Sequence, residues 1–305
     1  MEIGLINSAS ASANAMAMGL FQAPAATVLW HFLQGHIPQY TWDLIAQFRV
    51  LIIVAGLLVG FLIGLTGVGG GTLLTPMLVL FGVPPTVAVG TDLFYGSLTK
   101  MAGSYQHWKQ GSIQWKWVAY LASGSVPFAV LATYLIHFVN VRYGAADSMV
   151  RLGLGIVLVL AAFATIINEI YRKRRAQSTE SVPFDLEAHK GRIILVGALV
   201  GFLVGLTSVG SGALIAVVLI IFSGLSATTI IGTDIVHGLL LVSAAALAHW
   251  QIGTVNLPLA ANLLVGSLPG VVLGSRLAYY TPPRPLRFGV ALLVLAGGLK
   301  MVHLF

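Results

Sequence analysis

Cysteine is absent from the 305 residues of this chain, and charged side chains make up only 8% of it. The absence of cysteine excludes disulfide bonds, thiolate metal sites and cysteine nucleophiles. A soluble chain of this length would typically carry about a quarter of its residues as Asp, Glu, Lys and Arg, because it needs a hydrated surface. With 57% hydrophobic residues, the composition is instead typical of a polytopic membrane protein embedded in a lipid bilayer.

Acidic residues are scarce relative to basic ones, with 9 Asp and Glu against 16 Lys and Arg and a net charge of +7. A positive balance can indicate binding to nucleic acid. Here, however, the basic residues gather in loops between apolar segments, and the positive-inside rule of membrane topology explains that distribution. We therefore expect no nucleic acid among the partners.

Clear apolar segments begin after Arg49, and their approximate limits are 50–66, 72–82, 86–106, 115–138, 150–170, 192–207, 212–223, 228–248, 257–279 and 287–304. Most approach the roughly 20 residues that a spanning helix needs, whereas 72–82 and 212–223 are too short. Residues 1–48 are an N-terminal arm, whose apolar stretch contains Pro24, His31 and Gln34 and makes a weak span. An interfacial location is one interpretation of this arm.

An internal repeat relates the two short segments. The stretch GFLIGLTGVGGGTLL from Gly60 returns as GFLVGLTSVGSGALI from Gly201, VGTDLFYG at 89–96 returns as IGTDIVHG at 231–238, and HWKQGSIQW at 107–115 returns as HWQIGTVNL at 249–257. Beyond the N-terminal arm, the chain thus divides into a first transmembrane repeat at 49–171, a basic linker at 172–191 and a second repeat at 192–305.

The linker opens with the basic run RKRR at 172–175, so the positive-inside rule places it in the cytoplasm. Counting spans outward from it puts Lys109 and Lys116 inside and the uncharged turn 251–256 outside. Each half then crosses the membrane a net odd number of times, and the halves have opposite orientations. The sequence therefore predicts an all-α, multi-pass protein of the cytoplasmic membrane with the two inverted-topology repeats of secondary transporters.

A glycine-rich break in each half predicts a re-entrant hairpin, which three spanning helices follow. Inverted repeats bring the two hairpin tips together near mid-membrane, where freed backbone amides line a cavity and a helix N-terminus attracts an anion. The alternative is that the glycines only permit close helix packing. We single out as substrate-binding candidates the small tip residues Gly67, Gly69, Gly70, Gly71, Thr72, Ser208, Gly210, Ser211 and Gly212.

The glycine-rich signature, the following TPMLVLFGVPPTVAVGTD, the HW turn and their duplication resemble the sulfite exporter TauE/SafE family of membrane permeases. The resemblance covers nearly everything from residue 50 onward. It implies a permease for small sulfur-containing anions, such as sulfite, thiosulfate or an organosulfonate, and leaves the substrate and the direction open. Many members carry Ser where this chain has Asp92 and Asp234, which weakens any transfer of substrate identity.

Ionisable residues inside the spans are candidates for function, because a charge at mid-bilayer is costly. Asp92, Thr99 and Lys100 lie on one helical stripe by their spacing. We expect Lys100 to supply the positive charge that an anion needs once it has shed water. The alternative is a structural ion pair of Lys100 with Asp92 or Asp234 that only locks helices together.

Three residues are candidates for proton coupling, namely Asp92, Asp234 and His237, because a proton would offset the charge of a moving anion. The alternatives are that the acids cap backbone amides of the tips and that His237, whose repeat counterpart is Tyr95, packs between helices.

An enzyme, a metal permease and a passive channel are the competing classes. A serine dyad around Ser211 is disfavoured because its repeat counterpart is Gly70, so no catalytic residue is assigned. The acids and histidines lack ligand spacing, and neither a metal nor a cofactor is expected. A passive anion channel, or a permease for a carboxylate or sulfate, remains the alternative to alternating access, and the sequence does not indicate an oligomeric state.

Overall fold

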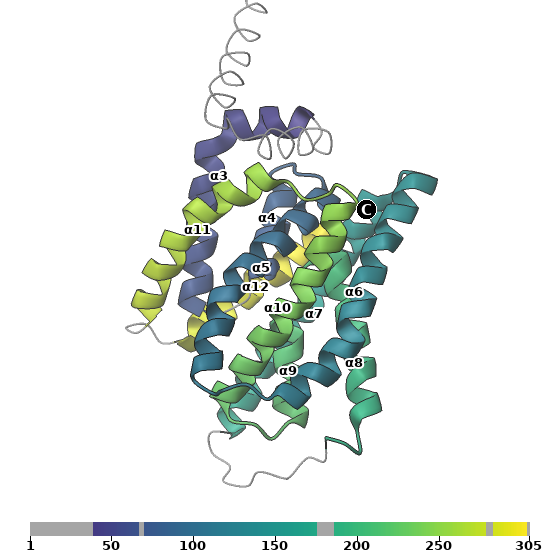
Figure 1. Cartoon of the computed structure of the whole chain (residues 1–305). Coiled ribbons are helices and arrows are strands. Elements are labelled where there is room, and N and C mark those ends of the chain that lie inside the picture. Colours follow the sequence, from purple (N-terminus) through teal and green to yellow (C-terminus); the bar gives the residue numbers. More distant parts are fainter. Residues whose placement is uncertain (1–38, 67–69, 176–185, 279–282, 304–305) are drawn as a thin grey trace, which may run out of the picture. The chain divides into compact units, whose positions relative to one another are not determined.

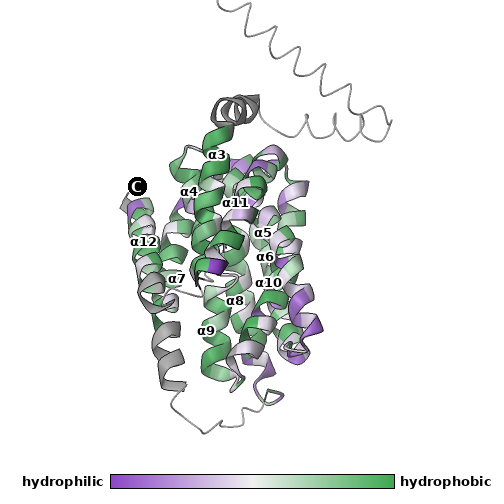
Figure 2. Ribbon diagram, turned by 90° about the vertical axis from the view of Figure 1, so that its left-hand side faces the viewer, coloured by the Kyte–Doolittle hydropathy of each residue, from purple (hydrophilic) through white to green (hydrophobic). Residues whose placement is uncertain are grey.

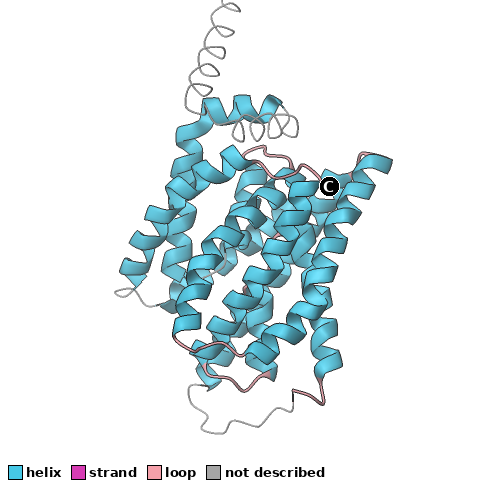
Figure 3. Cartoon of the chain, in the orientation of Figure 1, coloured by secondary structure: helices cyan, strands magenta, loops and turns pink. Residues whose placement is uncertain are grey.

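The structure is a computed structural model that describes residues 39–66, 70–175, 186–278 and 283–303. These ranges form helices joined by turns and loops, and no strand occurs in them (Figure 3). The chain divides into two compact units, residues 1–43 and 44–305. Of the first unit only residues 39–43 belong to the described ranges, as the start of a helix.

The first half contains α3 (Gln39–Thr66), the short 3-10 helix η1 (Gly70–Thr72), α4 (Leu74–Leu80), α5 (Pro85–Lys109), α6 (Trp115–Tyr143) and α7 (Ala146–Arg175). The second half contains α8 (Lys190–Thr207), α9 (Ala213–Phe222), α10 (Ala227–Gln251), α11 (Leu257–Ala278) and α12 (Pro283–His303) (Figure 1). Each apolar segment expected from the sequence corresponds to one of these helices. The main difference is at α3, which begins well before residue 50.

Local sequence explains where several helices start and stop. Helix α5 opens on Pro85, a position where the missing N–H costs no helical hydrogen bond. Helix α6 ends at Gly144, which takes the left-handed conformation with φ 64°. Helix α10 is capped by Ser226, whose side chain accepts a hydrogen bond from the Thr229 amide at 3.3 Å.

Five helices in the described ranges are long and apolar enough to cross a membrane: Trp115–Tyr143, Ala146–Ile167, Lys190–Thr207, Thr228–Gln251 and Leu257–Leu277. Large apolar side chains such as Leu195, Leu199 and Leu247 are more than 60% exposed on these helices. Hydrophobic residues continue along most of the length of the helices (Figure 2). Such surfaces are stable against lipid rather than water, so the protein is a multi-pass membrane protein.

Helices of one half pack against helices of the other in reciprocal pairs. Helix α8 lies against α6, and a Cβ added at Gly201 would lie 2.1 Å from the Ser125 carbonyl oxygen. Helix α3 lies against α11 in the same way, since a Cβ at Gly60 would lie 2.3 Å from the carbonyl oxygen of Ser267, the repeat counterpart of Ser125. Only glycine permits this approach, so Gly60 and Gly201 have the packing role that was the alternative interpretation.

A second reciprocal pair joins α5 and α10 to the turns of the opposite half. The Thr91 hydroxyl on α5 accepts a hydrogen bond at 3.0 Å from the backbone N–H of Asn256, which lies just before α11. Its repeat counterpart, the Thr233 hydroxyl on α10, accepts a hydrogen bond at 3.0 Å from the backbone N–H of Gln114, which lies just before α6. The two halves therefore share one packing scheme, in which these contacts occur twice with the halves exchanged.

Candidate functional site

The two glycine-rich segments are in backbone contact. A Cβ added at Gly71 in η1 would lie 2.3 Å from the carbonyl oxygen of Ser208, which ends α8. Ser208 has φ 62°, a left-handed conformation that is uncommon for a residue other than glycine, and Gly210 follows with φ 100°. These angles turn the chain sharply from α8 toward α9. The contact brings the predicted tips of the two halves together.

Asp92 on α5 links three elements at this contact. Its side chain is 1% exposed, and its Oδ2 accepts a hydrogen bond from Ser208 Oγ at 2.9 Å and another from Thr75 Oγ1 on α4. The donors are side-chain hydroxyls and not the backbone amides that a helix cap would use. Because a buried carboxylate is costly without such bonds, Asp92 ties α4 and α5 to the second tip. Sequence reasoning missed Thr75, although its repeat counterpart Ala216 marks it as a polar departure from the repeat.

Lys100 reaches from α5 toward α10 and the second tip. A Cβ added at Gly238 on α10 would lie 2.9 Å from Lys100 Nζ and 3.1 Å from the Ser211 carbonyl oxygen. The ammonium group therefore lies where α5, α10 and the second tip converge, and the absence of a side chain at Gly238 leaves room for it. Lys100 is partly exposed and makes no salt bridge with Asp92 or Asp234 within the described residues.

Asp234 and His237 lie one turn apart on α10, and the charge of Lys100 acts on both. Asp234 Oδ1 is buried and has no hydrogen-bond partner among the described residues. His237 is fully buried, and its Nε2 lies 2.8 Å from Ser125 Oγ on α6. Its Nδ1 has no hydrogen-bond partner in the part of the chain that the structure describes. Buried polar atoms without partners are rare and call for an explanation. Ser125 was not singled out from the sequence, although it lies in a repeated GSVP motif.

The other tip residues differ in their surroundings. Gly67 and Gly69 lie outside the described residues. Thr72 is buried, and a Cβ at Gly70 would make ordinary contacts at 3.5 Å. Gly212 precedes the first turn of α9, whose leading amides have no partner within the helix. The described residues contain no group of three or more His, Asp and Glu that could hold a metal ion.

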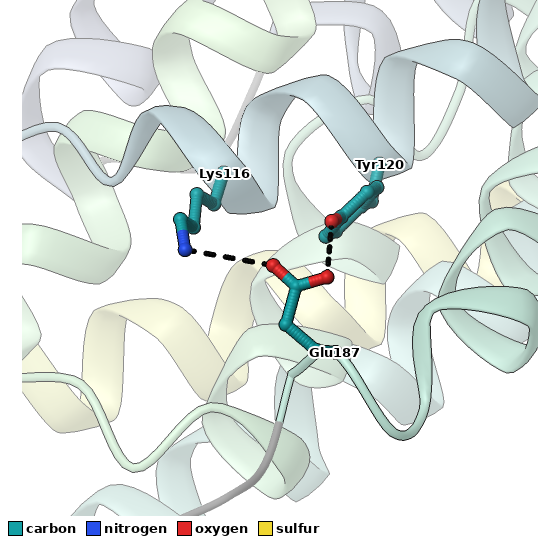
Figure 4. A network of polar contacts seen from close by, with 3 residues as sticks. All are labelled: Lys116, Tyr120 and Glu187. Atoms are coloured by element: carbon teal, nitrogen blue, oxygen red, sulfur yellow. Dashed lines mark hydrogen bonds and ion pairs between the residues drawn. The ribbon is translucent and has the colours of Figure 1, made fainter.

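A separate polar network lies on the surface, where the end of the linker meets α6. Lys116 Nζ is 3.5 Å from Glu187 Oε1, and the Tyr120 hydroxyl donates to Glu187 Oε2 at 2.7 Å (Figure 4). The Tyr120 hydrogen bond, helped by Lys116, lowers the pKa of the Glu187 carboxyl. Both charged side chains are largely exposed, so the pair contributes little stability. The network joins the end of the linker to the start of α6. These two segments belong to the side predicted as cytoplasmic.

An apolar bundle that encloses acids, a lysine and interrupted helices has the architecture of a membrane transporter. The chain belongs to the sulfite exporter TauE/SafE family, whose sequence profile matches residues 52–301. This confirms the resemblance seen in the repeated motifs. The family consists of membrane transporters and not of enzymes, and it places the chain in the cell membrane.

Relatives of similar length carry transporter names. The chain is 46% identical over 254 residues to the probable membrane transporter protein YjnA of Bacillus subtilis (strain 168), which covers 83% of this chain and 99% of that protein. It is 27% identical over 270 residues to the probable membrane transporter protein MJ0441 of Methanocaldococcus jannaschii, covering 83% and 94% of the two chains. No solved structure matches the chain.

Proposed function

We propose that this protein is a permease that moves a small sulfur-containing anion, such as sulfite, thiosulfate or an organosulfonate, across the cytoplasmic membrane. The observation that carries the proposal is the convergence of Lys100 Nζ with Ser211 and Gly238 at the second glycine-rich tip. An anion that leaves water needs a compensating positive charge, and the Lys100 ammonium group at a break between helices offers one. The sulfite exporter family supplies the substrate class.

The proposed mechanism is alternating access between two inverted repeats. Reciprocal packing of α3 on α11 and α8 on α6 supports a two-fold relation between the halves. The α5–α6 loop and its counterpart, the α10–α11 loop, lie at opposite ends of the bundle in Figure 1, which supports opposite orientations. Helices α4 and α9 are too short to span a bilayer, as the arms of re-entrant hairpins would be.

In this mechanism the anion binds between the two tips. The second tip, Ser208 to Ala213, leads into the ten-residue helix α9, whose N-terminus carries about half a positive charge. The first tip, Gly67 to Thr72, belongs to the other half, and its described residue Gly71 lies against Ser208. Glycine and serine at these positions let an anion come close to backbone amides, while Lys100 supplies the full charge.

Proton coupling completes the proposal, because moving an anion against the membrane potential requires a compensating charge. The charge of Lys100 acts on Asp92, Asp234 and His237. In this proposal these three groups can carry the proton. A passive channel would need none of them to change its protonation.

The test of transport is uptake by purified protein in liposomes. Sulfite, thiosulfate, a small sulfonate, sulfate and acetate are compared, each with and without an imposed pH gradient, and protein-free liposomes serve as the control. We expect selective flux of a sulfur anion that the gradient accelerates. Equal flux of all five anions without a response to the gradient would indicate a passive channel, and flux of only sulfate or acetate would move the substrate to another class.

The test of topology uses the absence of native cysteine, which leaves no background labelling. Single cysteines are introduced in the linker at 172–190 and in the turn at 251–256 of separate variants. A membrane-impermeant thiol reagent should label the two positions from opposite sides. Labelling of both from one side would refute the inverted arrangement.

A further inference from the structure

The two equivalent acids of the repeat differ in their hydrogen bonds. Asp92 accepts hydrogen bonds from the hydroxyls of Thr75 and Ser208. In the repeat, the sequence counterparts of these two donors are Ala216 and Gly67, and neither has a hydroxyl. Asp234 accordingly keeps a buried Oδ1 without a partner among the described residues. The sequence difference between the halves thus removes both donors from one acid and retains them for the other.

Lys100 is a second departure from the repeat, since its counterpart is Val242. The charge of Lys100 on α5 acts on Asp234, His237 lies one turn further along α10, and α9 carries no ionisable residue. The Lys, Arg and His residues of α6 and α8 are exposed: Lys116, His137, Arg142, Lys190 and Arg192. Among the described residues, Lys100 is therefore a cation that both acids and an arriving anion can share.

We propose that the two acids have separate tasks: Asp92 is a fixed link that holds α4 and α5 to the second tip, and Asp234 is the acid that takes up and releases the transported proton. This inference rests on the proposed function. A proton cycling on Asp92 would repeatedly disturb the bonds that join α4 and α5 to the second tip. Asp234 Oδ1 has no partner among the described residues, so Asp234 can gain and lose a proton there without breaking a bond of this kind.

The arrangement also sets the direction of coupling. An ionised Asp234 competes with the anion for the positive charge of Lys100, whereas a protonated Asp234 leaves that charge to the anion. Proton and anion therefore bind together and move in the same direction across the membrane. The product of each cycle is one proton and one anion released on the far side, with Asp234 ionised again.

The experiment compares variants by one ratio, the sulfite uptake into liposomes with an inward proton gradient divided by the uptake without it. Asp234→Asn should bring this ratio to unity. Ala216→Thr, which supplies a hydroxyl at the position equivalent to Thr75, should lower the ratio because proton uptake then disturbs a hydrogen bond. Thr75→Val should lower the unfolding temperature and keep the ratio of the wild-type protein. Ile231→Val, at a half-exposed position of α10, is the matched control.

A wild-type ratio in Asp234→Asn, or a ratio of unity in Thr75→Val at an unchanged unfolding temperature, would overturn the division of tasks. Wild-type uptake that ignores the gradient would overturn it as well, while leaving sulfur-anion transport intact. Protonation is also measured without transport, by the carboxyl band in infrared spectra of the purified protein across pH. The contribution of Asp234 to that band should be missing from the spectra of Asp234→Asn and retained in those of Thr75→Val. Absence of flux for every sulfur anion would instead refute the proposed function.

Discussion

Replacing Gly201 by alanine should destabilise the protein, although it adds only one methyl group. The new Cβ would lie 2.1 Å from the carbonyl oxygen and 2.4 Å from the Cα of Ser125, and both are backbone atoms of α6 that cannot rotate away. To restore ordinary contact, α6 and α8 must separate by about 1 Å, which forfeits roughly a quarter to a half of the dispersion attraction at that contact. Overpacking costs about 1–3 kcal/mol, and two rigid backbones place this variant near the upper end.

Thermal unfolding of purified protein in detergent measures the effect. Gly201→Ala should unfold at a temperature lower by on the order of 5 °C. Gly60→Ala should behave alike, because its Cβ would lie 2.3 Å from the Ser267 carbonyl oxygen in the reciprocal contact.

Gly297→Ala on α12 is the matched control. Among the described residues, no atom outside its own helix turn lies within 4 Å of the added Cβ, and alanine is the better helix former, so its unfolding temperature should stay the same or rise. If Gly201→Ala unfolded within about 1 °C of Gly297→Ala, the reasoning from backbone contact would be refuted.

Three further predictions concern single side chains. Lys100→Ala should reduce anion uptake by about tenfold or more, the factor that 1.4 kcal/mol of lost interaction produces, and normal uptake with normal affinity would remove Lys100 from the site. Thr75→Val keeps the side-chain volume but removes a donor to Asp92, so the free energy of unfolding should fall by about 1–3 kcal/mol, and an unchanged value would show that the bond is not stabilising. Glu187→Gln should lower stability slightly at neutral pH, because the lowered pKa of Glu187 favours the folded state. The difference from wild type should vanish as the pH falls through that lowered pKa, and a difference that persists in acid would contradict the ionic origin.

The helices and the correspondence between the two halves could be predicted from hydropathy and the repeat. Segments too short to span, at 72–82 and 212–223, became the short helices α4 and α9. The start of α3 at Gln39 was not predicted, because the polar residues before Arg49 carry no apolar period that marks a helix. Lys100 and the two acids stood out because ionisable residues inside apolar spans are conspicuous in any sequence.

Composition and repetition were enough to define a helical membrane transporter, its two related halves and its family, because lipid imposes long apolar helices and duplication leaves matching motifs. The partners of each polar side chain depended on how the helices pack. Asp92 and Ser208 are 116 residues apart in the chain, and only the contact between the two tips brings the hydroxyl to the carboxylate. Likewise, nothing in hydropathy places Lys100 against Gly238, since that contact follows from the crossing of α5 and α10. The unequal surroundings of Asp92 and Asp234 become visible only when the repeat in the sequence is compared with the packing in the tertiary structure.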